Sequence, residues 1–535
     1  MNDQKTNWLP LIAIIASMVM MYITSFSINV LITPIVNELN WSVSGLQLVI
    51  VSASLIAGSL QVTSGRLGDK LGKKKIFLIG SIIYTIGLTI VVLAPNSTVF
   101  SIAWALIWPL GMVMVIPTSV ALIMYFYQGT QRAAAFGIYG AVLSIVSAVA
   151  PLVVGLMANY TGWRVALALS PLFGIITIIL ALKLPETKKD SSIKIDIASV
   201  LLSVFSFGLF LISTTMAGQY GWFFEKRPFM IGESVISLGG LSIVPFLYLI
   251  SIVLLLVFFN RGKKLSKKGQ APLLDSSILK DKTFTIGAIL QSLLYFMVAA
   301  ILFVASVFVQ SAAGFDSFST ALTTLPASAA VAVFSFFTPN LGKKIMPKWI
   351  VVAGFVILGI GVYLLKMSIG VDITPMTLMP GMLLFGIGAG LIMAQIATVT
   401  MLNVKPEEEG GASGLSETMK EIIGQGFAIA FAGAVLFGGV YSNMTKEYAK
   451  AESIELSEEE TNEIILELED TFQSITPLEE KEFVNSLPEN TKNQYKQIVD
   501  KSASDAFSST MDILLIIVVA SIVLSVFLPS FKLEE

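Results

Sequence analysis

The sequence predicts an all-α polytopic membrane protein with 14 transmembrane helices. Hydrophobic residues make up 55% of the chain and charged residues only 13%, against the roughly 25% typical of soluble domains. The apolar residues form runs of about 20, the length that a helix needs to cross a hydrocarbon core about 30 Å thick. Lys and Arg gather in alternate connections between these runs, which is typical of membrane-spanning segments of alternating direction.

The predicted spans follow one another along almost the whole chain. The first ten residues lead directly into an apolar run without a small-residue cleavage site, so we interpret this run as a span and not as a removable signal. Residues 218–240 mix aromatic, charged and glycine residues, which leaves the ends of spans 7 and 8 poorly defined. The spans are expected at 9–32, 45–64, 75–95, 98–124, 133–158, 163–183, 197–216, 239–259, 284–309, 318–338, 349–367, 377–402, 415–441 and 510–529.

The distribution of basic residues predicts the orientation of the chain. Lys and Arg accumulate in cytoplasmic loops. The connections after spans 2, 6, 8 and 10 are basic, and those after spans 1, 3, 5 and 9 carry almost no basic charge, with Lys226, Arg227 and Lys366 as exceptions. We therefore expect a multi-pass protein of the cell membrane with both termini in the cytoplasm.

One polar segment, residues 442–509, interrupts the pattern between spans 13 and 14 and is expected outside the cell. It is rich in Glu, and helical spacing of apolar residues predicts a first helix containing Ile464, Ile465, Leu468 and Phe472. Pro477 and Pro488 are expected to divide the remainder into short helices. This acidic extracellular insert is either a solvated helical hairpin or a cap over the outer vestibule that attracts cations.

The connection after span 2, with the sequence GRLGDKLGKKK, combines glycine and charge. Gly65, Gly68 and Gly72 permit a tight turn and close helix approach, while the basic residues keep the turn at the anionic inner surface. Anchoring alone does not explain the acidic Asp69. We expect Asp69 to accept hydrogen bonds from a helix N-terminus or to pair with a basic residue of a neighbouring span, in a contact made in one conformation only.

Proton chemistry in this chain must use carboxylates, because the sequence contains neither Cys nor His. Within the predicted spans, the candidate acids are Glu417 and Glu421, which lie four residues apart and therefore on one face of a helix, with Lys420 about 100° from Glu421. Buried there, they are candidates for proton coupling. Alternatively, residues 422–441 alone are long enough to span, which would leave these charges in the inner headgroup layer.

Four further residues are candidates for a substrate cavity: Asn29, Trp104, Trp108 and Gln395. The two tryptophans are one helical turn apart and could stack on a flat or cationic compound. Asn29 and Gln395 could contact a substrate or form hydrogen bonds between helices. Packing and lipid contact are the alternative for the tryptophans.

The connection after span 2 resembles the G-x-L-a-D-r-x-G-r-k loop of the major facilitator superfamily. The residues that match it are Gly65, Leu67, Asp69, Gly72, Lys73 and Lys74. Other stretches resemble the 14-span drug and proton antiporter branch, including SAVAPLVVGLMANYTGWR in span 5, which keeps the signature residues Pro151 and Gly155. By this resemblance, Gly65, Arg66, Asp69, Gly72 and Lys73 form a conformational gate loop.

The resemblance implies two six-helix bundles plus two extra helices. We expect a first bundle in residues 1–185, the extra helices with their outer loop in 186–260, a second bundle in 261–441 with 510–535, and the insert in 442–509. The chain departs from the branch at Ser25, where an Asp is usual, and at Ile107, where an Arg is usual. These departures remove two charged residues of the branch's usual proton relay and put that relay in doubt.

The expected function is secondary active export of lipophilic or cationic drugs by alternating access, in exchange for protons, as in multidrug efflux and antibiotic resistance. Export of an endogenous metabolite or lipid and a transport-inactive sensor are the alternatives. An ATP-driven pump is excluded because the G-x-x-x-x-G-K-[ST] phosphate loop is absent, and an enzyme is not expected without His or Cys. We expect no cofactor, metal or nucleic acid, and a monomer whose partners are a small-molecule substrate, protons and lipid.

Overall fold

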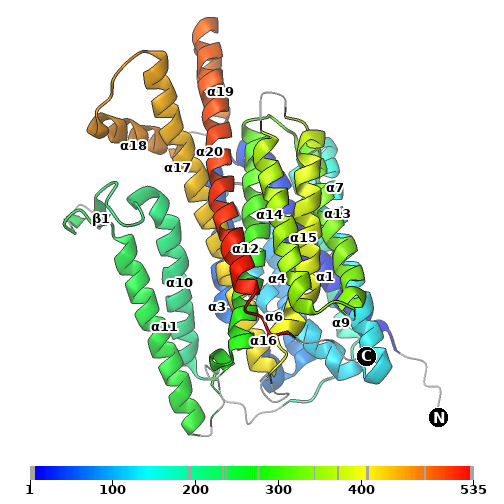
Figure 1. The fold of residues 1–535 in the computed structure, drawn as a ribbon. Coiled ribbons are helices and arrows are strands. Elements are labelled where there is room, and N and C mark those ends of the chain that lie inside the picture. Colours follow the sequence, from blue (N-terminus) through cyan, green and yellow to red (C-terminus); the bar gives the residue numbers. More distant parts are fainter. Residues whose placement is uncertain are drawn as a thin grey trace, which may run out of the picture.

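The computed structural model describes residues 7–189, 195–231, 234–236, 238–268, 270, 272–273, 278–342, 344–369, 373–404, 409–474 and 477–530. Within these ranges, 14 helical segments are long and apolar enough to cross a membrane. The predicted number of spans and the all-α class are therefore confirmed. Most helices stand side by side in a long bundle, as Figure 1 shows.

The first six spans form one half of the molecule. Two glycines with positive φ end long helices here, Gly72 at 101° after α3 and Gly162 at 85° after α7, a conformation that residues with a Cβ rarely adopt. The elements of this half are α1 (Leu9–Ser27), η1 (Ile28–Leu31), α2 (Ile32–Glu38), α3 (Val43–Leu71), α4 (Lys73–Val92), α5 (Ser97–Ile102), η2 (Ala103–Ile107), α6 (Trp108–Phe126), α7 (Gly129–Thr161), α8 (Trp163–Leu167) and α9 (Leu169–Leu182).

Two extra spans form a hairpin beside the bundle, α10 (Ile197–Tyr220) and α11 (Val244–Lys267), visible at the left of Figure 1. Asp196 caps α10 and binds the guanidinium of Arg261 on α11 through two hydrogen bonds of 2.6 and 2.7 Å. This contact with Arg261 holds the pKa of Asp196 well below its usual range. Between the helices, β1 (Phe229–Ile231) pairs antiparallel with β2 (Ser234–Ile236), a small hairpin that the sequence did not predict.

The remaining spans form the other half. Asp281 and Thr374 cap its helices α12 and α15 by accepting backbone N–H groups. The elements of this half are η3 (Ile278–Lys280), α12 (Lys282–Ser311), α13 (Ser317–Gly342), α14 (Pro347–Met367), α15 (Pro375–Thr400), α16 (Glu409–Met419), η4 (Lys420–Phe427), α17 (Ala428–Ala451) and α20 (Glu489–Ser525).

The insert differs from its prediction in extent. Span 13 continues as α17 to Ala451, and α20 begins directly after Pro488 and runs for 37 residues, so no short helix follows this proline. Two helices lie between them, α18 (Glu458–Ser474), which contains the predicted apolar residues, and α19 (Pro477–Ser486). In Figure 1, α18 lies across the upper left of the bundle, above the β1 loop.

The two halves meet along α7 with α13 and along α3 with α16 and η4. We call the end with residues 65–75 the basic end and the opposite end, with α18 and α19, the insert end. At the insert end, the side chain of Gln310 on α12 accepts from Thr33 N at 3.0 Å and donates to Asn29 O at 2.8 Å. Asn159 on α7 also donates to Asp316 at 2.6 Å. Hydrogen bonds therefore join the halves at the insert end.

Candidate functional site

A cluster of three charged side chains lies on α16 and η4, between the two ends of the bundle. Lys420 forms ion pairs with Glu417 and with Glu421, the latter at 3.8 Å between Nζ and Oε1. Glu421 is only 4% exposed, and Gln425 donates a hydrogen bond of 2.9 Å to it. Glu421 thus lies inside the protein and not at its surface, and each charge of the cluster has a partner of opposite sign.

The backbone of η4 is a π-helix, a form that often occurs at functional sites. Two glycines in it allow neighbouring helices to approach closely. A Cβ on Gly424 would lie 2.8 Å from the Cβ of Tyr295 on α12, and one on Gly426 would lie 3.0 Å from Leu211 on α10. The local sequence EIIGQGF therefore brings the charged cluster against helices from other parts of the chain.

Three tyrosines from three helices surround the cluster. The ring of Tyr295 on α12 lies 5.0 Å from Lys420 Nζ, a cation–π contact. Tyr22 on α1 and Tyr139 on α7 belong to the other half and lie close enough to Lys420 and Glu417 to interact electrostatically. The cluster therefore stands where the two halves face each other, and a rearrangement of the halves would change its surroundings.

Sequence reasoning identified the two glutamates of this site but missed its other members. Lys420 was noted only for its angle from Glu421, although its position three residues after Glu417 is a helical ion-pair spacing that could have revealed it. Tyr22, Tyr139 and Tyr295 carry no local signal, because isolated tyrosines in apolar runs are common and only the packing of three distant helices brings these together.

A narrow pocket lies between the halves, on the insert-end side of Tyr22. Its lining includes Asn29, Pro151, Ser306 and Thr324. The Asn29 Oδ1 and Ser306 Oγ atoms are buried without a hydrogen-bond partner in the described part of the chain. Of the four predicted cavity residues, Asn29 is thus the one that lines this pocket between the halves.

The other three predicted cavity residues lie elsewhere. Trp104 and Trp108 are 2% and 5% exposed and pack edge to face at 5.3 Å between ring centroids, within an aromatic group of the first half that includes Phe100 and Trp163. Gln395 on α15 is 1% exposed and donates to Thr338 O on α13 at 3.1 Å. The structure does not bring these side chains to the charged cluster.

The signature residues of span 5 lie at the contact between the halves. Pro151 lines the narrow pocket. A Cβ on Gly155 would lie 2.7 Å from the backbone oxygen of Ser317 and 3.1 Å from the Cβ of Ala321, both on α13. Gly155 therefore permits the close approach of α7 and α13.

The loop at the basic end has the following contacts. Asp69 pairs with Lys73, the first residue of α4, at 3.7 Å. Arg66 donates to Pro272 O at 2.5 Å, which joins the first half to the segment before α12. Burial lowers the pKa of Arg66 from its ordinary value. A Cβ on Gly65 would lie 3.9 Å from the Cβ of Pro117 on α6.

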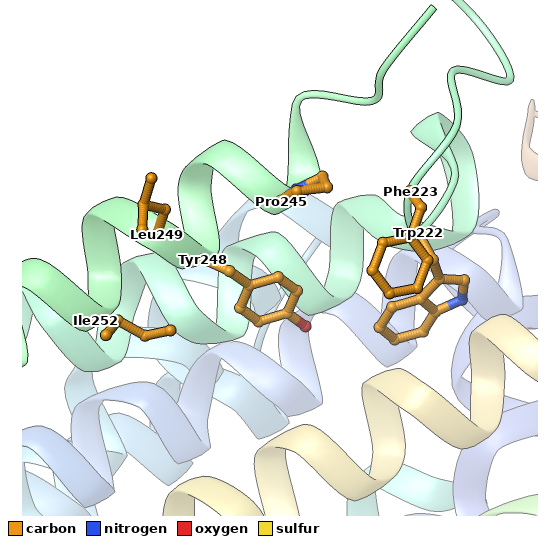
Figure 2. Close-up of a pocket in the computed structure, with 6 residues that line it drawn as sticks. All are labelled: Trp222, Phe223, Pro245, Tyr248, Leu249 and Ile252. Atoms are coloured by element: carbon orange, nitrogen blue, oxygen red, sulfur yellow. The ribbon is translucent and has the colours of Figure 1, made fainter.

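A second pocket lies in the extra hairpin, as Figure 2 shows. It has a volume of about 280 Å³ and is lined by Trp222, Phe223, Pro245, Tyr248, Leu249 and Ile252. The hydroxyl of Tyr248 is paired with Thr214 at 2.7 Å. Its lining is almost entirely apolar, and it lies outside the contact between the halves.

A family model described as the Major Facilitator Superfamily matches residues 14–231 and 234–429. The chain belongs to this superfamily. It is 26% identical over 434 residues to the multidrug resistance protein Stp of Mycobacterium tuberculosis, covering 81% of this chain and 76% of Stp. It is also 25% identical over 447 residues to the probable actinorhodin transporter of Streptomyces coelicolor, covering 82% of this chain and 74% of that protein.

The fold agrees with this membership. A bacterial homologue of the human lysosomal transporter Spinster, solved in an inward-facing and occupied conformation, superposes with a TM-score of 0.63 at 15% sequence identity, covering 100% of both chains. The predicted superfamily is thus confirmed, and the names of the relatives agree with the drug-efflux branch that the motifs resemble. The protein is a multi-pass membrane transporter of small molecules and not an enzyme.

Proposed function

We propose that this transporter exports lipophilic or cationic compounds across the cytoplasmic membrane by alternating access, in exchange for protons. The observation that carries the proposal is the ion-paired group Glu417, Lys420 and Glu421 at the contact between the halves, in which Glu421 is buried. A carboxylate inside a span costs free energy, so its presence there points to a function. Because the chain has no His, carboxylates are the side chains left for proton exchange.

The proposed orientation puts the basic end in the cytoplasm, with both chain termini on that side. The two rocking bodies are the bundles of residues 1–185 and of 261–441 with 510–535. In the present conformation, hydrogen bonds at Gln310 and Asn159 join the halves at the insert end. Outward opening must break these bonds, and Gly65, Arg66, Asp69, Gly72 and Lys73 would then close the basic end further, beyond the contact that Arg66 already makes with Pro272 O.

In the proposed cycle, a proton taken up from outside neutralises one glutamate of the cluster and is released to the cytoplasm. Substrate enters the cavity between the halves when that glutamate is ionised. Glu421, the more buried acid, accepts a hydrogen bond from Gln425, and Glu417 is the more accessible of the two, with 30% of its side chain exposed against 6%. Exchange of a proton with the cavity is therefore expected first at Glu417.

The test is dye transport into inverted vesicles, where the cytoplasmic face points outward and export runs into the lumen, scored with and without a pH gradient against cationic and neutral dyes. Glu417→Gln cannot release a proton, so gradient-driven efflux is expected to fall at least tenfold while facilitated exchange of dye remains. Unchanged gradient-driven efflux in Glu417→Gln would show that the assignment is wrong. Absence of efflux of any dye by the wild type would favour the sensor.

A further inference from the structure

Lys420 fills a group of side chains whose chemistry would suit an organic cation. Its ammonium group lies between two carboxylates of its own helix and faces the ring of Tyr295. Carboxylates and an aromatic face are together the set of groups that bind an organic cation. Here the protein's own side chain satisfies them.

We infer that Lys420 is a resident cation that sets the charge selectivity of this transporter, excluding permanently cationic substrates in favour of neutral lipophilic ones. The inference rests on the proposed function and narrows its substrate class. A lipophilic cation can reach the carboxylates only after displacing the lysine, whereas a neutral compound can bind the tyrosines and the apolar walls with the lysine in place.

The groups around the lysine come from its own span and from three other helices. On its own span these are Glu417, Glu421 and Gln425, and from α1, α7 and α12 they are the three tyrosines. With both acids ionised, the two negative charges and one positive charge leave the cluster at −1. This charge attracts cations from the cavity, but the space next to it is filled by the ammonium group.

The distance between charges makes the expected effect large. At about 4 Å, two unit charges interact strongly even at the effective dielectric constant of about 20 found in proteins. A cationic ligand placed beside Lys420 would lose most of its attraction to the carboxylates through repulsion by the ammonium. Removing the ammonium should therefore strengthen cation binding at least tenfold, which corresponds to about 1.4 kcal/mol.

The experiment measures the affinities of the purified full-length protein in nanodiscs for tetraphenylphosphonium and for its neutral analogue triphenylphosphine oxide. In Lys420→Met, the Kd of the cation is expected to fall at least tenfold while the Kd of the neutral compound stays within about twofold. The matched control is Lys366→Met. Lys366 is another lysine of a span, and its Nζ pairs with Asp512 at a distance of 2.5 Å, in a part of the protein away from the cluster. It should leave both affinities unchanged.

A double variant separates occupancy from overall charge. Glu417→Gln with Lys420→Met keeps the cluster at −1, since one charge of each sign is removed. It should still bind the cation more tightly than the wild type, because the ammonium no longer fills the subsite. This variant also carries the test if Lys420→Met alone does not fold.

Three results would overturn the inference: an unchanged cation affinity in Lys420→Met, an equal change for both ligands, or a return to the wild-type cation affinity in the double variant. The binding measurement uses no ion gradient. A gain in cation binding without any gradient-driven efflux would therefore contradict the proposed function and leave the role of Lys420 supported.

Discussion

Gly155 on α7 lies against the backbone of α13, where the two halves of the transporter touch. We predict that Gly155→Ala destabilises this contact by about 1 to 3 kcal/mol, because the added methyl group meets the Ser317 oxygen and the α13 backbone must shift. Thermal unfolding in detergent should show a lower Tm for this variant.

The control for this prediction is on the same helix. Gly137→Ala adds a methyl group where no atom lies within 4 Å, so it should leave the Tm unchanged or raise it slightly through lower backbone entropy of the unfolded chain. Equal Tm values for the two variants would contradict the idea that Gly155 is needed for close helix approach.

At the scale of elements, ion pairs connect α18 of the insert to the extra hairpin. Arg227, in the loop after α10, pairs with Asp470 at 2.5 Å and with Glu469 at 3.2 Å. Glu469 is only 3% exposed, and burial raises its pKa above the ordinary value despite Lys226 and Arg227. The insert and the hairpin are therefore connected through a partly desolvated carboxylate.

This carboxylate makes docking of α18 depend on pH. Because the pKa of Glu469 is higher in the docked state, docking takes up protons: its contribution is fully present below the ordinary Glu pKa and is lost as pH rises through the raised value. Burial also raises the pKa of Glu480 on α19, with the same sign. Hydrogen bonds with Ser457 lower the pKa of Glu460, a shift of the opposite sign whose contribution is lost only as pH falls below the ordinary Glu pKa.

We predict that amide hydrogen exchange in α18, corrected for the intrinsic rate, is slower at pH 5 than at pH 8. Glu469→Gln should remove most of this difference, since a neutral amide cannot titrate. Glu467→Gln, which changes an exposed acid on the same helix, should keep it. Protection that increases with pH in the wild type would contradict a raised pKa of Glu469 in the docked state.

For the whole molecule, alternating access requires the insert end to open. Asn159 on α7 and Asp316, directly before α13, lie 2.6 Å apart between their side-chain atoms, and the chain has no native cysteine to react in the background. Asn159→Cys with Asp316→Cys, joined by a short bifunctional thiol reagent, should reduce efflux at least tenfold. Either single variant treated with the reagent is the control, and full efflux by the linked protein would refute the opening movement.

The large features of the molecule were predictable because they depend on local composition. Runs of apolar residues predicted the 14 spans, and the apolar spacing around Leu468 predicted α18. The basic loops predicted that successive spans cross the membrane in opposite directions. The small β-hairpin and the length of α20 were missed, since short strands and polar helical extensions carry weak signals. Glu417 and Glu421 were recognised as acids in a span, but their neighbours Tyr22 and Tyr139 come from the other half of the chain, and no local pattern contains that contact.

The π-helical segment η4 joins the charged cluster to α17 through a wider turn than an α-helix has. Converting this wide turn to an ordinary α-helical turn would rotate the part on its basic-end side by about one residue, or 100°, relative to α17. Glu417 and Lys420 would then leave the contact between the halves while the span remained continuous. The span can therefore move these charges into or out of the contact between the halves by changing between π-helical and α-helical hydrogen bonding in η4.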